Sequence, residues 1–178
     1  VGRLDRLISD ISQASRVDTE IIGRDGEAFD FVELLDNFIQ LRQPGFADQT
    51  LLFTKPEQPV MVRGQDGRIV QVLDNLLSNA ASFSPKGGDI KFELVMSQKP
   101  SQAVLHIMDE GPGIPENRLD TVFQRIYSER PKGESFGDHS GLGLSIASQI
   151  IEGHEGRLCA SNRPSGGPCF ALSFLFAH

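Results

Sequence analysis

Two asparagines lie four residues apart in a segment whose apolar spacing predicts a helix, so Asn75 and Asn79 share one helical face. Gln71 and Ser82 extend this polar row, which runs beside a stripe of aliphatic residues rather than opposite it. The row therefore borders the core, where a groove can form, and its amide oxygens could hold a hard cation such as Mg²⁺ next to phosphate oxygens. A solvated helix face is the alternative, and the row alone does not decide between the two.

A Gly- and Pro-rich stretch from Asp109 to Pro115 directly follows a predicted central strand and is the second candidate site. Glycine lets the backbone approach a ligand closely and adopt a positive φ. A buried carboxylate at the strand end can accept a hydrogen bond from an exocyclic amine, such as the N6 amine of adenine. A tight structural turn has the same composition, so this alternative stays open.

The third candidate is the segment from Ser140 to Ser145, which contains two glycines and leads from a long loop into a helix. Unpaired N–H groups and the positive end of the helix dipole at such an N-terminus attract a phosphate. The segment is not a Walker loop, because no Gly-Lys-Ser/Thr follows, and it is not a Rossmann fingerprint. A glycine-assisted helix start is the alternative.

The elements that carry these residues follow from apolar spacing and from the positions of Gly and Pro. Helices are predicted over residues 1–22, from Asp30 to Pro44, from 67 or 68 to 83, over 116–123 and over 141–152. Strands are predicted at 28–29, 50–54, 59–63, 89–98, 103–109, 157–162 and 169–176, the last two joined by a hairpin turn. This mixed order predicts an α+β, two-layer sandwich with helices on one face of a mixed, mostly antiparallel sheet.

Local signals predict how two of these helices begin and which residues face the core. Asp30, three residues before Glu33, predicts a capping box, and Asp66 predicts the N-cap of the asparagine-bearing helix. Leu41 is assigned to the apolar face of the helix that follows Asp30. Residues 124–140 have little apolar periodicity and are interpreted as a long surface loop of the kind that is usually functional or disordered.

Composition excludes several classes of protein. The chain has 178 residues, enough for roughly one domain, and its 39% apolar and 23% charged residues are ordinary for a folded domain. A net charge of −7 disfavours a general nucleic-acid or anionic-membrane binder, and no apolar run reaches the length of a membrane span. Cys159 and Cys169 are interpreted as core thiols of a cytosolic protein. The N-terminus lacks an initiator Met, so we expect a fragment with room for a membrane segment upstream.

In this order and context, the three segments resemble the nucleotide-binding boxes in the catalytic domain of bacterial sensor histidine kinases. That domain belongs to the GHKL ATPase superfamily, which also contains gyrase, the ninety-kilodalton heat-shock chaperone and MutL. The matching segments are the N box at Gln71–Ala80, the G1 box at Asp109–Pro115, the F box at Val122–Tyr127 and the G2 box at Gly141–Ala147. The resemblance covers residues 28–178 and implies a Bergerat-type ATP-binding fold.

The rest of the chain fits the same resemblance. Residues 1–22 are similar to the end of the second helix of the dimerisation and phosphoacceptor domain, and 23–27 would be the linker. The loop at about 124–140 corresponds to the family's lid over the nucleotide. The lid sequence from Tyr127 most resembles the ChvG type of alphaproteobacterial envelope sensor.

The resemblance implies roles for individual residues. Asn79 and Asn75 match the Mg²⁺-binding positions, and Asp109 matches the aspartate that reads adenine. The catalytic candidates are Asn75, Arg125 and Arg130, the arginines because a guanidinium suits the geometry of the γ-phosphate. The implied nucleotide-binding positions are Asn79, Ser82, Phe83, Lys86, Asp109, Gly111, Gly113, Ile114, Tyr127, Ser140, Gly141, Leu142, Gly143 and Leu144.

The chain departs from the family's pattern at two places. Many relatives carry Lys where Ser82 stands, so a phosphate contact is missing or comes from Lys86 or a lid arginine. The lid reads Ile126-Tyr127-Ser128 in place of the common Phe-Tyr-Arg, which displaces its arginine to Arg130. None of the four histidines has the sequence context of the family's phosphoacceptor, so the acceptor is expected outside this chain.

The implied function is binding of ATP with Mg²⁺ and transfer of the γ-phosphoryl group to a histidine on an upstream dimerisation domain. Gyrase-type relatives have a water-activating glutamate where this chain has Asn75, which favours transfer over hydrolysis. The implied partners are ATP, the protein's own dimerisation and phosphoacceptor domain and the receiver domain of a response regulator, with no nucleic acid. The full-length protein is expected to be a homodimeric inner-membrane sensor with this domain in the cytoplasm.

Two alternatives remain at this point. One is an anti-sigma-factor serine kinase, against which the predicted helix at 1–22 argues because it resembles part of a dimerisation bundle. The other is a nucleotide-binding regulatory module without transfer activity, which the Ser82 departure and the missing acceptor keep open.

Overall fold

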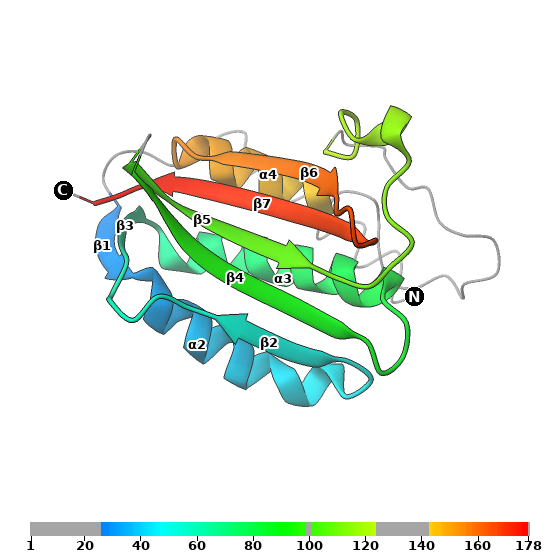
Figure 1. Ribbon diagram of the computed structural model, residues 1–178. Helices are drawn as coiled ribbons and strands as arrows, with labels where there is room; N and C mark the ends of the chain where they lie inside the picture. Colours follow the sequence, from blue (N-terminus) through cyan, green and yellow to red (C-terminus); the bar gives the residue numbers. More distant parts are fainter. Residues whose placement is uncertain (1–25, 99–100, 124–142, 178) are drawn as a thin grey trace, which may run out of the picture.

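A sheet covered on one face by helices forms the body of the domain (Figure 1). The computed structural model describes residues 26–98, 101–123 and 143–177. In chain order the elements are β1 (Glu27–Asp30), α2 (Phe31–Arg42), the 3₁₀ helix η1 (Gln43–Phe46), β2 (Thr50–Thr54), β3 (Met61–Gly64), α3 (Asp66–Phe83), β4 (Asp89–Gln98), β5 (Ser101–Met108), the 3₁₀ helix η2 (Glu116–Arg118), α4 (Gly143–Gly153), β6 (Arg157–Asn162) and β7 (Pro168–Leu175).

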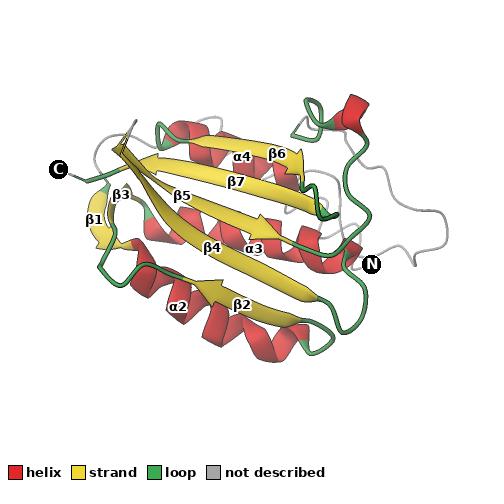
Figure 2. Ribbon diagram, in the orientation of Figure 1, coloured by secondary structure: helices red, strands yellow, loops and turns green. Residues whose placement is uncertain are grey.

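The main sheet has five strands in the order β2-β4-β5-β7-β6. The β2–β4 pair is parallel and the other pairs are antiparallel, and α2, α3 and α4 lie on one side of it (Figure 2). This confirms the predicted α+β sandwich and the central place of β5. Met108 pairs with Cys169, so β7 begins beside the end of β5. Strands β1 and β3 form a separate antiparallel pair.

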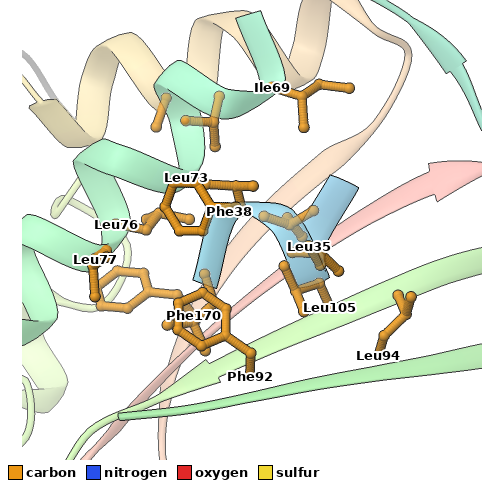
Figure 3. Close-up of a cluster of buried hydrophobic side chains, with 14 of the residues drawn as sticks. Leu35, Phe38, Ile69, Leu73, Leu76, Leu77, Phe92, Leu94, Leu105 and Phe170 are labelled. Carbon is orange, nitrogen blue, oxygen red and sulfur yellow. The ribbon is translucent and has the colours of Figure 1, made fainter. Parts of the chain in front are cut away.

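The core lies between the helices and the main sheet. Leu35 and Phe38 from α2 meet Phe92 and Leu105 from the sheet (Figure 3). All six residues of the predicted apolar stripe on α3 are buried, namely Ile69, Val72, Leu73, Leu76, Leu77 and Ala80. Each of the Ile, Val and Leu side chains in this stripe contributes on the order of 2 kcal/mol by leaving water. Burial of this stripe sets the orientation of α3 and places the polar row at the border of the core.

Helix α2 begins where the sequence predicted. The Asp30 carboxylate accepts hydrogen bonds from the N–H of Val32, at 2.9 Å, and from the N–H of Val60, at 3.2 Å. It therefore caps the helix and ties it to the chain before β3. The assignment of Leu41 to the core was wrong, because its side chain is 73% exposed. Leu41 lines an open groove between α2 and the start of α3.

The start of α3 differs from the prediction by one residue. Gln65 occupies the N-cap position, and its side chain makes no capping hydrogen bond. Asp66 is instead the first helical residue, and its carboxylate accepts from the N–H of Gly67 at 2.7 Å. The N–H of Gln65 is satisfied from a distant part of the chain, by Nε2 of His154 at 3.0 Å.

Two further predictions need correction. Only Glu116–Arg118 of the predicted helix over 116–123 is helical, as a 3₁₀ turn, since the segment meets the core only at its end, through Val122 and Phe123. Cys169 is buried as expected, but Cys159 is exposed, because the alternation along the edge strand β6 points it away from the helices. The predicted helix at 1–22 and lid at 124–140 lie outside the described residues.

No helix within the described ranges has both the length and the apolar composition needed to cross a bilayer.

Candidate nucleotide-binding site

The asparagine row on α3 faces the first turn of α4. Nδ2 of Asn75 donates a hydrogen bond to the carbonyl oxygen of Gly143 at 3.1 Å. A Cβ built on Gly143 would lie 3.8 Å from the Asn75 side chain, which is ordinary contact. Asn79 follows one turn further along α3 and is half-buried. The first and third candidate segments are therefore adjacent, although 68 residues separate their hydrogen-bonded members.

Asp109 stands at the end of β5 with only 1% of its surface exposed. One carboxylate oxygen, Oδ1, accepts a hydrogen bond from the N–H of Gly111 at 2.7 Å. Burial raises the pKa of Asp109 to about 6, against the opposing effects of the Gly111 hydrogen bond and the positive charge of Arg163. A buried carboxylate in these surroundings could accept a hydrogen bond from a ligand amine.

The stretch after Asp109 packs directly on the last turn of α3. A Cβ added to Gly111 would lie 2.7 Å from Oδ1 of Asp109 and 3.0 Å from the carbonyl oxygen of Phe83. No side chain fits there, so Gly111 brings the second candidate segment against α3. Gly113 has φ of +88°, which favours glycine. All three candidate segments thus meet along α3.

The donor set at this place fits a magnesium–nucleotide complex. The amide oxygens of Asn75 and Asn79 are hard ligands of the type that Mg²⁺ takes alongside water and phosphate oxygens. The Nδ2–Gly143 hydrogen bond occupies the nitrogen of the Asn75 amide and leaves Oδ1 as its acceptor. Asp109 provides a buried carboxylate that could accept a hydrogen bond from a base, and the missing side chain of Gly111 lets the backbone pack against it.

The other predicted residues fall into three groups. Ser82 and Phe83 are half-buried in the last turn of α3, and Lys86 is exposed in the turn that follows. Ile114 is half-buried after the glycine stretch, and Leu144 is half-buried at the start of α4 and packs on the core. The predicted residues that lie outside the described part of the chain are Arg125, Arg130, Tyr127, Ser140, Gly141 and Leu142.

The sequence interpretation missed the turn between β6 and β7. Asn162 hydrogen-bonds the backbone of Ile114, and Arg163 donates to the carbonyl oxygen of Asp109. Polar side chains in a Gly- and Pro-rich turn predict a hairpin and nothing more. Only the pairing of β7 with β5 brings this turn to Asp109, and a single sequence does not reveal that pairing.

Comparison with known proteins identifies the family of this chain. Residues 64–178 match the family model described as "Histidine kinase-, DNA gyrase B-, and HSP90-like ATPase". The chain therefore belongs to this ATPase family. The match includes α3, the Asp109 stretch and the start of α4, which are the elements that form the candidate site.

Its relatives include two named sensors. Sensor protein ChvG of Rhizobium meliloti is 41% identical over 171 residues, which are 91% of this chain and 29% of the relative. ChvG of Agrobacterium fabrum is 39% identical, with coverage of 91% and 28%. The chain thus spans less than a third of these relatives. The solved mycobacterial sensor histidine kinase MprB superposes with a TM-score of 0.73 at 29% identity, covering 85% of this chain and 97% of that one.

Proposed function

We propose that this domain binds ATP with Mg²⁺ and donates the γ-phosphoryl group to a histidine of a dimerisation domain upstream of the described residues. A ring nitrogen of that histidine would attack the γ-phosphorus, the bond to the β,γ-bridging oxygen would break, and ADP would leave. Such a transfer depends mostly on positioning and charge neutralisation. Family membership and the resemblance to named sensor kinases support this proposal.

The observation that carries the proposal is the meeting of three segments along one helix. Asn75 contacts the start of α4, and Phe83 contacts the glycine stretch after Asp109, from positions two turns apart on α3. A base held at Asp109 and phosphates held at the first turn of α4 would therefore lie along the same helix. This order along the helix is the one that a ligand with a base at one end and phosphates at the other would need.

Asn79 and Asn75 are the residues that we assign to the cation. Bound Mg²⁺ would supply positive charge that offsets the charge developing on the phosphate oxygens. Asn75 has a further consequence, because an amide does not take a proton from water as a carboxylate does. We therefore infer that the site favours transfer to a histidine over hydrolysis, and that the phosphate end also uses Ser82 or Lys86 and the arginines Arg125 and Arg130.

The wider assignment follows from the same resemblance. We propose that residues 1–22 end a dimerisation helix, 23–27 link it to the catalytic domain at 28–178, and about 124–140 form the lid. The full-length protein would then be a homodimeric, membrane-anchored sensor that passes the phosphoryl group to a response regulator. The 41% identity to a sensor protein over nearly the whole chain supports this assignment.

The test uses the full-length protein with its upstream domain. After incubation with ATP labelled in the γ-phosphate and Mg²⁺, the protein should carry phosphate that is acid-labile and base-stable, as phosphohistidine is. The Asp109→Asn variant should carry none. Binding of ATP without any such phosphate would contradict transfer and favour a nucleotide-binding regulatory module, and phosphate stable to acid on serine would favour a serine kinase.

A further inference from the structure

The turn from Asn162 to Gly167 joins β6 to β7 and lies against the end of β5. Its own closure uses only main-chain groups. The N–H of Arg163 donates to the carbonyl oxygen of Gly167 at 2.9 Å, and the N–H of Gly166 donates to the carbonyl oxygen of Arg163 at 3.0 Å. The side chains of Asn162 and Arg163 are therefore not needed to make the turn, and both reach to a different part of the chain.

Asn162 holds Ile114 by both of its backbone polar groups. The side-chain oxygen Oδ1 accepts from the N–H of Ile114 at 2.8 Å, and Nδ2 donates to the carbonyl oxygen of Ile114 at 2.6 Å. This two-point contact fixes the position and the orientation of the residue. A Cβ on Gly113 would lie 2.9 Å from Oδ1 of Asn162, so the neighbouring glycine makes room for the contact.

Arg163 holds the other end of the same stretch. Its Nη2 donates to the carbonyl oxygen of Asp109, where β5 ends. Gly167 contacts the same carbonyl group, since a Cβ placed there would lie 2.3 Å from the oxygen. The turn thus hydrogen-bonds the backbone of Asp109 at the start of the glycine stretch and the backbone of Ile114 near its end.

We propose that Asn162 and Arg163 are positioning residues that hold the Asp109–Ile114 stretch in the shape that reads the exocyclic amine of adenine. This inference rests on the proposed nucleotide function. Held at two points, the stretch keeps the Asp109 carboxylate aimed at the base without rearrangement on binding, which preserves affinity. The phosphates are assigned to α4, which the turn does not hold. Loss of the contact should therefore weaken recognition of the base and leave the phosphate end unchanged.

The positive charge of Arg163 also supports its assignment as a positioning residue for Asp109. Its positive charge lowers the pKa of Asp109, against the raising effect of burial. The guanidinium thereby favours the ionised carboxylate, which is the stronger acceptor for an amine. Arg163→Lys keeps the charge, whereas Arg163→Gln removes it, so these two variants separate charge from side-chain shape.

The test compares dissociation constants for ATP and for inosine triphosphate, in which a carbonyl group replaces the exocyclic amine. Calorimetry with Mg²⁺ should show that the wild-type chain prefers ATP. In Asn162→Ala the affinity for ATP should fall about fivefold, the size expected for two partly solvated hydrogen bonds. The affinity for inosine triphosphate should change little, so the preference shrinks. Arg163→Gln should likewise weaken binding of ATP and leave binding of inosine triphosphate nearly unchanged. Arg163→Lys should retain most of the preference for ATP over inosine triphosphate.

Matched controls come from exposed residues of the same types. Asn37→Ala on α2 and Arg157→Ala on β6 should leave both dissociation constants unchanged. Thermal unfolding verifies that each variant is folded, and Asn162→Asp, which keeps the acceptor for the Ile114 N–H, serves if Asn162→Ala does not fold. In the full-length protein, Asn162→Ala and Arg163→Gln should raise KM for ATP and leave kcat unchanged.

Three outcomes would overturn the inference. They are equal losses for both nucleotides, unchanged binding in Asn162→Ala and Arg163→Gln, and a wild-type chain that binds the two nucleotides equally. The failure of the proposed function looks different, because the wild-type chain would then bind neither nucleotide.

Discussion

In the proposed function, recognition of the base depends on the carboxylate of Asp109. It is buried, and burial raises its pKa to about 6, above the ordinary value of 3.8. The folded state therefore binds a proton more readily than the unfolded state between these two values. The cost of keeping this carboxylate ionised is absent at low pH and is fully present above about pH 6.

Asp109→Asn should separate stability from binding. At neutral pH the variant removes a buried charge and keeps an oxygen for the Gly111 N–H, so the unfolding midpoint should not fall. Binding of ATP should weaken on the order of 100-fold, because a charged acceptor for the base amine is replaced by a neutral amide. Thermal unfolding and calorimetric titration measure the two effects. An unchanged dissociation constant would show that Asp109 does not contact the nucleotide.

The same carboxylate predicts a dependence of binding on pH. Affinity for adenosine should weaken as the pH falls through about 6, because protonation removes the charge that accepts the amine. Adenosine is the suitable probe, since it has no phosphate groups that titrate in that range. Titration of wild-type protein at several pH values, with Asp109→Asn as the pH-insensitive control, measures this. Equal affinity on both sides of pH 6 would contradict the assignment.

At this scale the sequence predicted the residue and not its surroundings. Asp109 and its glycines were singled out because a carboxylate at the end of an apolar strand is followed by a Gly- and Pro-rich segment. Arg163 and Asn162 were not found, because their contacts with Asp109 and Ile114 arise from the pairing of strands distant in the chain. Hydrogen bonds of this kind leave no local pattern of residue types.

At the scale of the elements, His154 joins α3, α4 and the main sheet. Its Nδ1 lies 2.7 Å from the carbonyl oxygen of Ile150, and its Nε2 accepts from the N–H of Gln65. The ring also packs edge-on against Phe174 and over Gly64, where a Cβ would lie 2.4 Å from it. Only the neutral ring with its proton on Nδ1 satisfies both hydrogen bonds.

His154→Gln should destabilise the fold and alter its response to acid. Burial lowers the pKa of His154 below 6.5, and the nearby positive charge of Arg68 acts in the same direction. The unfolded state therefore binds the proton more readily, so stability is full above pH 6.5 and is lost as the pH falls below it. At neutral pH the free energy of unfolding of His154→Gln should be about 1 kcal/mol lower than that of the wild type.

Chemical unfolding at a series of pH values measures this prediction. The difference in free energy of unfolding between the wild type and His154→Gln should shrink as the pH falls below 6.5, since the wild type alone loses the histidine contribution. A difference that stays constant or grows with acid would contradict the neutral, buried ring.

The elements themselves were largely predictable where periodicity was strong. Strands β4 and β6 have the predicted bounds, and the α3 stripe is buried in full. The wrong predictions concern residues whose burial or helical structure depends on tertiary packing rather than on local sequence. Leu41 continues the apolar spacing of α2 but meets an open groove, and the segment after Pro115 has helix-compatible residues but contacts the core only at its end. The pairing of β1 with β3 was also not predicted, because short strands do not specify their partners.

At the scale of the whole molecule, the candidate site depends on the complete two-layer fold. The asparagine row comes from a helix, the carboxylate from the end of the central strand, and the first turn of α4, to which we assign the phosphates, comes from a second helix. The sheet and the α3 stripe hold these parts together through buried apolar contacts, and the Asn75–Gly143 hydrogen bond adds to them within the site. A ligand that joins them should therefore stabilise the entire domain against unfolding.

If these parts form one site for ATP with Mg²⁺, titration of the wild-type chain with ATP should show saturable binding of one ATP per chain. The binding should be clearly tighter in the presence of Mg²⁺ than in its absence. Asn79→Ala should lose most of that difference, and the exposed control Asn37→Ala should keep it. No binding of ATP, or an affinity that is the same with and without Mg²⁺, would contradict the account.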